Sequence, residues 1–413
     1  MSEDAKKRLA RLFEGLADSV ESGAGLADLA EGANGRRLRI GLTVLGSEHG
    51  PGEIIDGARS ALCSCPDLQV ALIGPAKLAK PVRDVPHMCL YPAASEKEQH
   101  RQMERLLDAG EIDACVAMHY NFPIGVSTVG RVVTPGRGRE MFIATTTGTS
   151  GTERVGNMIR NAVYGIIAAK ASGVVEPTVG VLNIDGARQV ERALRRLSDS
   201  GYPIGFAESA RAGGGAVMRG NDLLMATPDV MVCDSLTGNL LMKVLSAGST
   251  GGCYESVGYG YGPGIGEGYT RTILIISRAS GAPVVAGAIR YASDIVRGGI
   301  LSVAEAEFAA AHRAGWPDVR PPNGEEMFGR QVSPQAAEKA GTPGTESVEP
   351  PPEKVVTCDI AGVDILQLEA AVRLLWSAGI YAETGMGCTG PVVMVADEDA
   401  RAARKALESG GYL

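Results

Sequence analysis

Short apolar runs alternate with amphipathic stretches along most of this 413-residue chain. Apolar runs between turn residues are typical of buried strands, and apolar positions spaced three or four apart are typical of helices. The predicted strands are 38–44, 70–73, 114–117, 141–144, 179–183 and 230–233, and the predicted helices are 53–62, 96–107, 157–169 and 188–197. Strands that alternate with helices predict an α/β fold with a doubly wound, mostly parallel sheet.

The same pattern divides the chain into four regions. In residues 1–35, Leu9, Leu12, Phe13, Leu16 and Val20 share one face of a predicted docking helix. Residues 36–315 form the predicted α/β body. Residues 316–354 are rich in proline and poor in large apolar residues, so we expect a tether there. The alternation returns in residues 355–413, which predict a small C-terminal α/β module.

Composition narrows the function classes. The net charge is −8 and the chain has no block of basic residues, so nucleic acid is not an expected partner. No apolar run reaches the roughly 18 residues of a membrane span, and the charged N-terminus lacks the apolar stretch of a signal peptide. The eight cysteines include no paired zinc-binding spacing. We therefore expect a cytoplasmic protein without a metal.

The densest chemistry is the segment Gly385–Pro391, which holds Cys388 between glycines. Three glycines and a proline predict a tight loop, in which a poorly covered thiol is a candidate nucleophile because backbone N–H groups stabilise a thiolate. The alternative is a small residue packed in a turn. An exposed thiol on a tethered module suggests a mobile carrier, although a lobe packed firmly on the body is equally compatible with the pattern.

Three loops after predicted strands are candidate anion sites: 46–52, 145–152 and 233–239. Such loops bind phosphate where they lead into a helix N-terminus. None is a Walker A loop, and none matches G-x-G-x-x-G in a strand–turn–helix context, so we expect no nucleotide cofactor. The candidate phosphate or acyl-phosphate ligands are Thr147, Gly148, Thr149, Ser150, Asp234, Ser235, Thr237, Gly238 and Asn239. Asp234 is alternatively a helix N-cap.

Other cysteines are alternative candidates for the nucleophile, and two histidines are candidate bases. Cys253 is also flanked by glycines, whereas Cys233 and Cys358 lie at or in predicted strands, where burial is expected. His49 and His119 follow predicted strands and are candidate general bases, although a loop histidine is often only structural.

Several of these segments carry a family resemblance. Residues 179–184, 228–239 with Lys243, and 260–268 followed by 272–276 resemble signature segments of the phosphate acyltransferases of phospholipid synthesis. That resemblance covers about residues 38–298 and implies a fold of the phosphotransacetylase/isocitrate dehydrogenase-like type. The whole chain, with the motif around Cys388, resembles the alpha subunits of component C of glycine/sarcosine/betaine reductase complexes.

The second resemblance implies a specific reaction. Cys388 would carry an acetyl-like group as a thioester, and the body would deliver inorganic phosphate to release an acyl phosphate. The implied partners are a ketoacyl-synthase-like beta subunit and an acyl-donor selenoprotein or carrier thiol, in a hetero-oligomer that contains a homodimer of this chain. Two alternatives stay open: direct transfer between phosphate and a carrier-protein or coenzyme A thiol, and a scaffold that has lost turnover. The acyl group and the pathway are not determined.

Overall fold

The computed structural model describes residues 37–151, 153–211, 215–316, 350–352, 354–363, 367–387 and 390–413. The predicted N-terminal helix, nearly all of the predicted tether, and Cys388 lie outside the described residues. Trp316, the first residue of the predicted tether, is buried at the end of a helix of the body.

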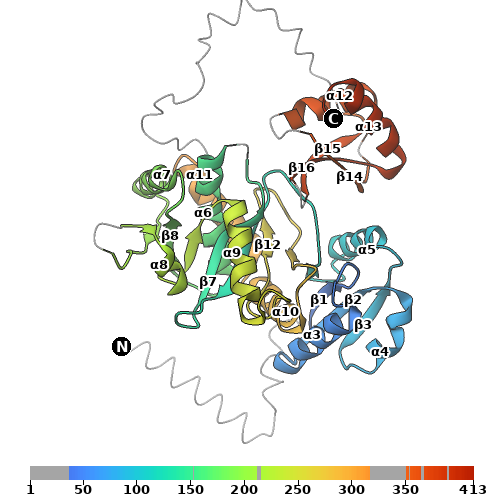
Figure 1. The fold of residues 1–413 in the computed structure, drawn as a ribbon, viewed down its shortest axis with the longest axis horizontal. Helices are drawn as coiled ribbons and strands as arrows, with labels where there is room; N and C mark the ends of the chain where they lie inside the picture. Colours follow the sequence, from blue (N-terminus) through green and yellow to red (C-terminus); the bar gives the residue numbers. More distant parts are fainter. Residues whose placement is uncertain are drawn as a thin grey trace, which may run out of the picture.

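The body is built on one large sheet of twelve strands (Figure 1). They are β1 (Leu38–Thr43), β2 (Leu68–Gly74), β3 (Met88–Pro92), β4 (Ala114–Ala117), β6 (Ser127–Val133), β7 (Glu140–Gly148), β8 (Thr178–Leu182), β9 (Gly205–Phe206), β10 (Val217–Met218), β11 (Val230–Val232), β12 (Gly262–Ile265) and β13 (Ile273–Ile275). Their order is β10-β8-β11-β7-β6-β12-β13-β4-β1-β2-β3, with β9 beside β8.

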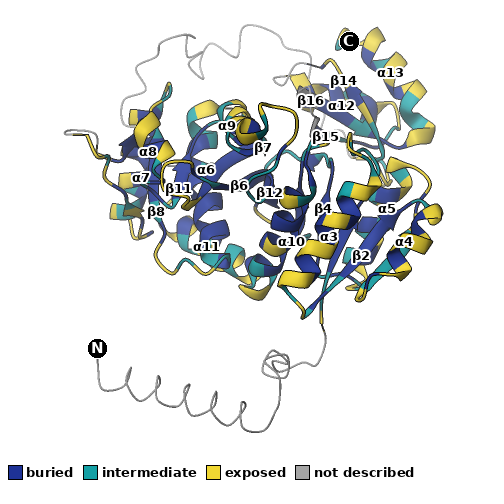
Figure 2. Ribbon diagram, turned by 60° about the horizontal axis from the view of Figure 1, so that its bottom comes forward, coloured by how far each residue is buried: buried dark blue, intermediate teal, exposed yellow. Residues whose placement is uncertain are grey.

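Helices cover both faces of this sheet. They are α3 (Pro51–Ser64), η1 (Ala76–Leu78), α4 (Ala79–Arg83), α5 (Glu96–Asp108), α6 (Arg154–Ala171), α7 (Ala187–Asp199), α8 (Gly220–Leu224), α9 (Ser235–Ala247), η2 (Gly248–Thr250), α10 (Ala282–Arg297) and α11 (Ile300–Arg313). Successive residues of β2 show why two layers form: Val70 and Leu72 join the core beneath α3 and α10, whereas Ala71 and Ile73 join the core beneath α5. Figure 2 shows the buried strands between helices whose outer faces are exposed. The predicted α/β fold with a mostly parallel sheet is confirmed.

The strand direction reverses in the middle of the sheet. The strands β10, β8, β11 and β7 are parallel to one another, and so are β13, β4, β1, β2 and β3. Between these groups, the β7–β6, β6–β12 and β12–β13 pairs are antiparallel. Because three reversals separate the groups, their carboxyl ends lie at opposite edges of the sheet.

The C-terminal module has its own sheet and core. It contains β14 (Cys358–Ala361), α12 (Leu368–Ser377), β15 (Ala382–Gly387), β16 (Gly390–Val395), η4 (Asp397–Asp399) and α13 (Ala400–Ser409). Its sheet order is β14-β16-β15-β5, where β5 (Phe122–Pro123) belongs to the body. The module thus extends its sheet by one short strand taken from the segment between β4 and β6.

Two glycine-rich segments form strands. Residues 259–266 contain the buried strand β12, which was not among the predicted strands. The expected tight loop at Gly385–Pro391 is instead largely strand, because β15 continues to Gly387 and β16 begins at Gly390, with these two glycines paired across the ladder. Glycine in these strands allows close packing: a Cβ on Gly264 would lie 2.2 Å from the Phe122 ring.

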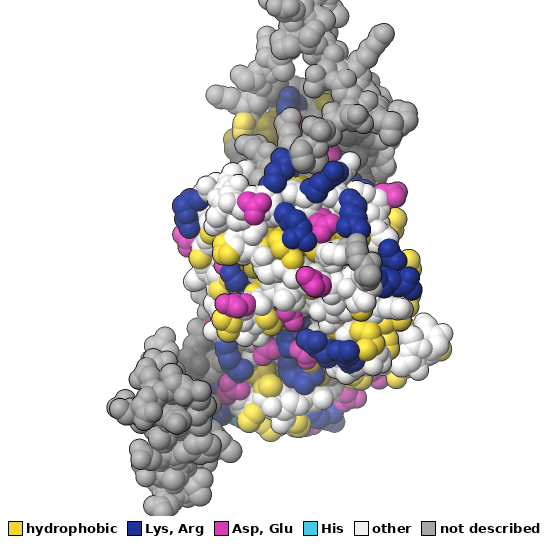
Figure 3. Space-filling model, turned by 90° about the vertical axis from the view of Figure 1, so that its left-hand side faces the viewer, with side chains coloured by type: hydrophobic (Ala, Val, Ile, Leu, Met, Phe, Trp, Pro, Cys, Tyr) yellow, Lys and Arg dark blue, Asp and Glu magenta, His cyan; other side chains and the backbone are white. Residues whose placement is uncertain are grey.

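Charges of both signs share the outer surface. The end of the body that includes α7 and α8 shows Lys and Arg side chains interspersed with Asp and Glu (Figure 3). On α7, Arg188 and Arg195 both pair with Glu191, at 3.0 and 3.1 Å. In the described part of the chain, no helix is both long enough and apolar enough to cross a bilayer.

Candidate functional site

A cavity of about 170 Å³ lies where β7 and β11 end and where α6 and α9 begin. It is lined by Thr145, Gly148, Thr149, Ser150, Gly151, Arg154, Asn157, Asn161, Asp234 and Ser235. The first amides of a helix have no partner within the helix and carry a partial positive charge, so two helix N-termini at one cavity favour an anion. At α6 the N-cap residue Glu153 makes no side-chain capping bond, which leaves the first amides of that helix uncapped by this side chain.

Asp234 closes the cavity on the α9 side. Its carboxylate accepts hydrogen bonds from the Thr237 backbone N–H and from the Thr237 hydroxyl, both at 2.9 Å, and from Arg154 Nη2 at 2.9 Å. Burial raises the pKa of Asp234, but these hydrogen bonds and the Arg154 charge outweigh it, so the pKa lies below its usual value. Asp234 is therefore an ionised N-cap that also lines the cavity. The two roles considered for it from the sequence, a helix N-cap and a residue of the site, are compatible.

Contacts across the cavity hold its two loops together. A Cβ on Gly238 would lie 1.8 Å from the carbonyl oxygen of Thr145, so only glycine allows α9 to approach β7 this closely. Asn239 Nδ2 donates to the carbonyl of Thr146 at 3.2 Å. Thr237, Gly238 and Asn239 thus position the loops rather than line the cavity, and Thr147 also lies outside the lining.

The hydroxyls of the first loop are committed to the protein. Thr149 Oγ1 donates to the carbonyl of Gly151 at 2.7 Å, and Ser150 Oγ lies 3.0 Å from Asn161 Oδ1. Asn157 Nδ2 also donates to the Gly151 carbonyl, at 2.9 Å. These bonds stiffen the loop, so the donors that remain for an anion are backbone amides at the helix starts and Arg154 of α6.

Sequence reasoning missed Arg154, Asn157 and Asn161. All three lie on α6, where polar residues on a predicted amphipathic helix are indistinguishable from an ordinary solvated face. The signal that was available is their position, because they fall in the first two turns of a helix that follows a candidate anion loop.

The candidate bases His49 and His119 do not line this cavity. They follow β1 and β4, whose carboxyl ends lie at the other edge of the sheet. His49 is near Tyr254, with ring centroids 5.9 Å apart. Burial lowers the pKa of His119 and Arg278 adds to this effect, while Asp359 of the module and Glu96 oppose it.

The described cysteines differ in exposure. Cys233 is buried, and burial raises the pKa of its thiol well above the usual value, as expected for a packed residue. Cys358 is partly buried in β14, and burial raises its pKa too. Cys253 is exposed and stays a competing nucleophile. Among the residues described, no three His, Cys, Asp or Glu side chains are placed to hold a metal ion.

Comparison with known proteins agrees with this architecture. The family described as "Fatty acid synthesis protein" matches residues 38–394, and the chain belongs to this family. Over 410 residues and 99% of both chains, it is 52% identical to the glycine/sarcosine/betaine reductase complex component C subunit alpha of Peptoclostridium acidaminophilum.

More distant relatives match about half of the chain. The phosphate acyltransferase of Thermus thermophilus is 27% identical over 237 residues, which cover 50% of this chain and 70% of the relative. That of Lysinibacillus sphaericus is 23% identical over 248 residues, which cover 53% and 73%. Both resemblances drawn from the motifs are therefore confirmed, and together these relatives support an acyl-transfer role.

Proposed function

We propose that the chain is an acyltransferase subunit that holds a short acyl group as a thioester on Cys388 and releases it to inorganic phosphate. The observation that carries this proposal is the cavity at the starts of α6 and α9, where two loops far apart in sequence form one site suited to an oxyanion. Full-length similarity to a reductase complex subunit, rather than to phosphate acyltransferases alone, supports a role for the C-terminal module that carries Cys388.

The reaction balances without a separate base. An oxygen of hydrogen phosphate attacks the thioester carbonyl, a C–O bond forms and the C–S bond breaks. The proton of hydrogen phosphate passes to the departing thiolate, which leaves an acyl phosphate dianion and the Cys388 thiol. A thiolate is a workable leaving group near neutral pH. The amides at the helix starts would stabilise the negative charge of the phosphate and of the tetrahedral intermediate.

The contacts between the C-terminal module and the body support a carrier module that moves. In the β5–β15 pair, Gly385 lies opposite Pro123 and Met386 opposite Phe122. The strand therefore runs toward Asn121 at its end, away from Ser150 and the phosphate cavity. The other contacts with the body combine polar pairs with one apolar side chain: Lys97 pairs with Asp397 at 2.5 Å, Asn121 bonds to Asp359, and Ile124 packs against the core of the module. We propose that the module leaves this position to deliver its acyl group.

We also propose that this chain assembles with partner subunits through a surface on α9. An exposed apolar stripe runs along α9, where Leu236, Leu240 and Val244 are 81%, 63% and 59% exposed. Side chains four apart share one helix face, and exposed apolar faces mark interaction sites. This surface supports the predicted assembly with a second copy or with the ketoacyl-synthase-like subunit.

Acylation of the isolated full-length chain tests the function. After incubation with acetyl phosphate, intact-protein mass spectrometry should show one added acetyl group that hydroxylamine removes. Cys388→Ser should abolish the adduct, whereas the matched Cys253→Ser variant should keep it. An adduct that persists in Cys388→Ser and maps to Cys253 would contradict the proposal. Acyl phosphate formation without any protein adduct would favour direct transfer between phosphate and a separate thiol, the reaction that the phosphate acyltransferase relatives suggest.

A further inference from the structure

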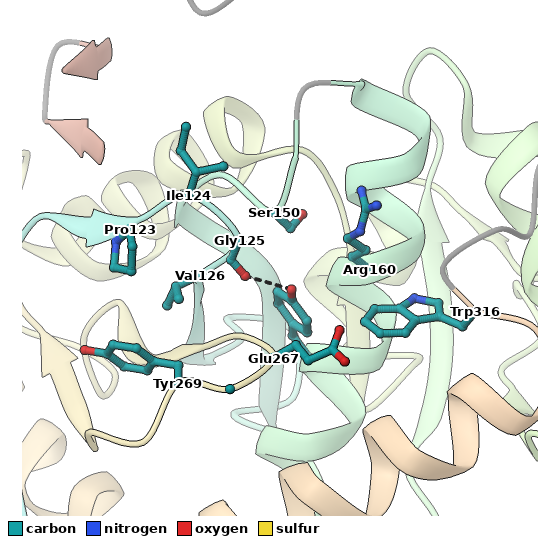
Figure 4. Close-up of a pocket in the computed structure, with 11 residues that line it drawn as sticks. Pro123, Ile124, Gly125, Val126, Ser150, Arg160, Glu267, Tyr269 and Trp316 are labelled. Carbon is teal, nitrogen blue, oxygen red and sulfur yellow. Dashed lines mark hydrogen bonds between the residues drawn. The ribbon is translucent and has the colours of Figure 1, made fainter. Parts of the chain in front are cut away.

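A second cavity of about 320 Å³, whose lining residues are drawn in Figure 4, is larger than the proposed phosphate cavity. The two cavities share Ser150. Its walls come from the segment around Val126, from α6, from the loop that follows β12 and from Trp316 at the end of α11. Ligand pockets usually span roughly 300–1,000 Å³, so this cavity suits a small organic group.

The two arginines of α6 near these cavities differ in their partners. Arg154 is held by Asp234 at 2.9 Å and lies 3.9 Å from Asp185. For Arg160, no ion pair with a described carboxylate is formed. A Cβ added to Gly151 would lie 2.7 Å from Arg160 Nη1, so this guanidinium lies against the bare backbone of Gly151. Since Gly151 lines the phosphate cavity and Arg160 lines the second one, Arg160 stands at their junction.

Aromatic side chains fix the size of the second cavity. The Tyr164 hydroxyl donates to the carbonyl of Gly125 at 2.8 Å, so its ring is held as a wall. Trp316 stacks on Phe308 with ring centroids 5.5 Å apart, and it is 3% exposed. Tyr164 meets the same Phe308 ring edge-on at 5.8 Å. A cavity bounded by interlocked rings cannot widen without cost, because packed cores tolerate extra volume poorly.

The positive charge of Arg160, at the junction of the two cavities, is available to a ligand. The one carboxylate of this lining, Glu267, is engaged by His312 Nε2 at 2.6 Å and is about half exposed. Arg160 is thus the lining cation whose charge is not already matched by a described partner. Planar guanidinium groups bind phosphoryl and carboxylate oxygens through paired hydrogen bonds, which suits a group placed between a phosphate site and an organic site.

We infer that the second cavity is the acyl subsite, and that Arg160 binds the oxygens where the acyl and phosphoryl groups join. This inference rests on the proposed transfer to phosphate and specifies its substrate class: acyl phosphates with short chains, whose acyl end reaches Trp316. Each extra methylene in a fitted pocket changes transition-state binding by roughly 10- to 200-fold, so the wall at Trp316 discriminates against long chains.

Both the role of Arg160 and the limit on acyl-chain length can be tested with the full-length chain. The measurement is the rate at which labelled inorganic phosphate exchanges into acyl phosphates. We expect exchange with acetyl and butyryl phosphate, and exchange at least about tenfold slower with octanoyl phosphate. Arg160→Gln should slow exchange with the short substrates by about 100-fold. Arg59→Gln, which removes an exposed arginine of α3 paired with Asp56, is the matched control and should not change it. Trp316→Ala should raise the octanoyl-to-butyryl ratio about tenfold, and Trp316→Phe, which keeps a ring on Phe308, should raise it less.

The contrary results separate the two proposals. Equal exchange of octanoyl and butyryl phosphate by the wild-type chain, or an Arg160→Gln variant as fast as the control, would overturn the acyl subsite and leave the function standing. Absence of exchange with every acyl phosphate would contradict the function instead. In that event calorimetry on Cys388→Ser protein decides the subsite: butyryl phosphate should bind at least about tenfold more tightly than octanoyl phosphate, and Arg160→Gln should remove that binding. Equal binding, or no binding, would overturn it.

Discussion

The proposed phosphate cavity, at the starts of α6 and α9, and the C-terminal module are held in place by different kinds of contact. Around the cavity, a backbone-to-backbone approach at Gly238, an ionised N-cap and several buried hydrogen bonds fix each loop. The module has a core of its own, and it meets the body through a two-residue strand pair, the apolar side chain of Ile124 and a few polar contacts. Binding a small anion needs donors fixed in advance, whereas passing a group between sites needs a detachable carrier.

The largest effect should follow from filling the space at Gly238. Gly238→Ala places a Cβ 1.8 Å from the Thr145 carbonyl oxygen, so α9 must move away from β7. We expect a loss of about 3 kcal/mol or more in the free energy of unfolding of the body, measured by denaturant titration, together with loss of phosphate binding. Gly52→Ala is the matched control, since a Cβ there meets nothing within 4 Å and alanine favours its helix. Equal stability of the two variants would show that the cavity is not rigid.

A smaller effect should follow from neutralising Asp234. Its pKa is lowered in the folded protein, so the carboxylate stabilises the fold at neutral pH. This stabilisation is lost as the pH falls below about 5, through the usual value of 3.8 and on through the lowered folded value. Asp234→Asn keeps a good N-cap but removes the titration, so the acid limb of a stability-versus-pH curve should become shallower. Asp234→Ala also removes the cap and should cost about 0.5–2 kcal/mol at neutral pH. An unchanged acid limb in Asp234→Asn would contradict the ionised N-cap.

The smallest effect should come from the contact between the module and the body. Lys97 and Asp397 are 28% and 67% exposed, and exposed ion pairs contribute little. We expect Lys97→Gln to lower hydrogen-exchange protection of β5 and β15 by less than about fivefold, and to leave the cavity loops unaffected. A much larger loss, or one that spreads to the cavity, would mean that body and module form one rigid unit.

The sequence predicted those elements whose local pattern reflects their packing. The strand at 114–117 matches β4, and the helix at 96–107 matches α5 to within one residue, because buried strands and amphipathic helices repeat at fixed periods. Loop 145–151 and the residues Asp234 and Ser235 lie together because they follow β7 and β11, which are parallel neighbours in the sheet.

Other features depend on partners far away in the chain. The strand β5 has two residues and exists through pairing with β15, more than 250 residues later, and glycine-rich β12 lacks the β-branched residues that favour strands. Arg160 is a surface residue by its pattern, and only the approach of Gly151 and Trp316 makes it part of a cavity wall. Asp234 and Arg154 are 80 positions apart, so no local rule pairs them.

The reversal at β6 and β12 also has a consequence for how this protein changes over generations. Loops at the two edges of the sheet face opposite directions, so a substitution in one set need not be compensated in the other. Selection can then alter the module contacts at Lys97 and Asn121 while the loops after β7 and β11 keep their shape. Pro123 is the exception, because it pairs with β15 and also lines the second cavity. Under the proposed function, a lineage could acquire a new partner without rebuilding the proposed phosphate site.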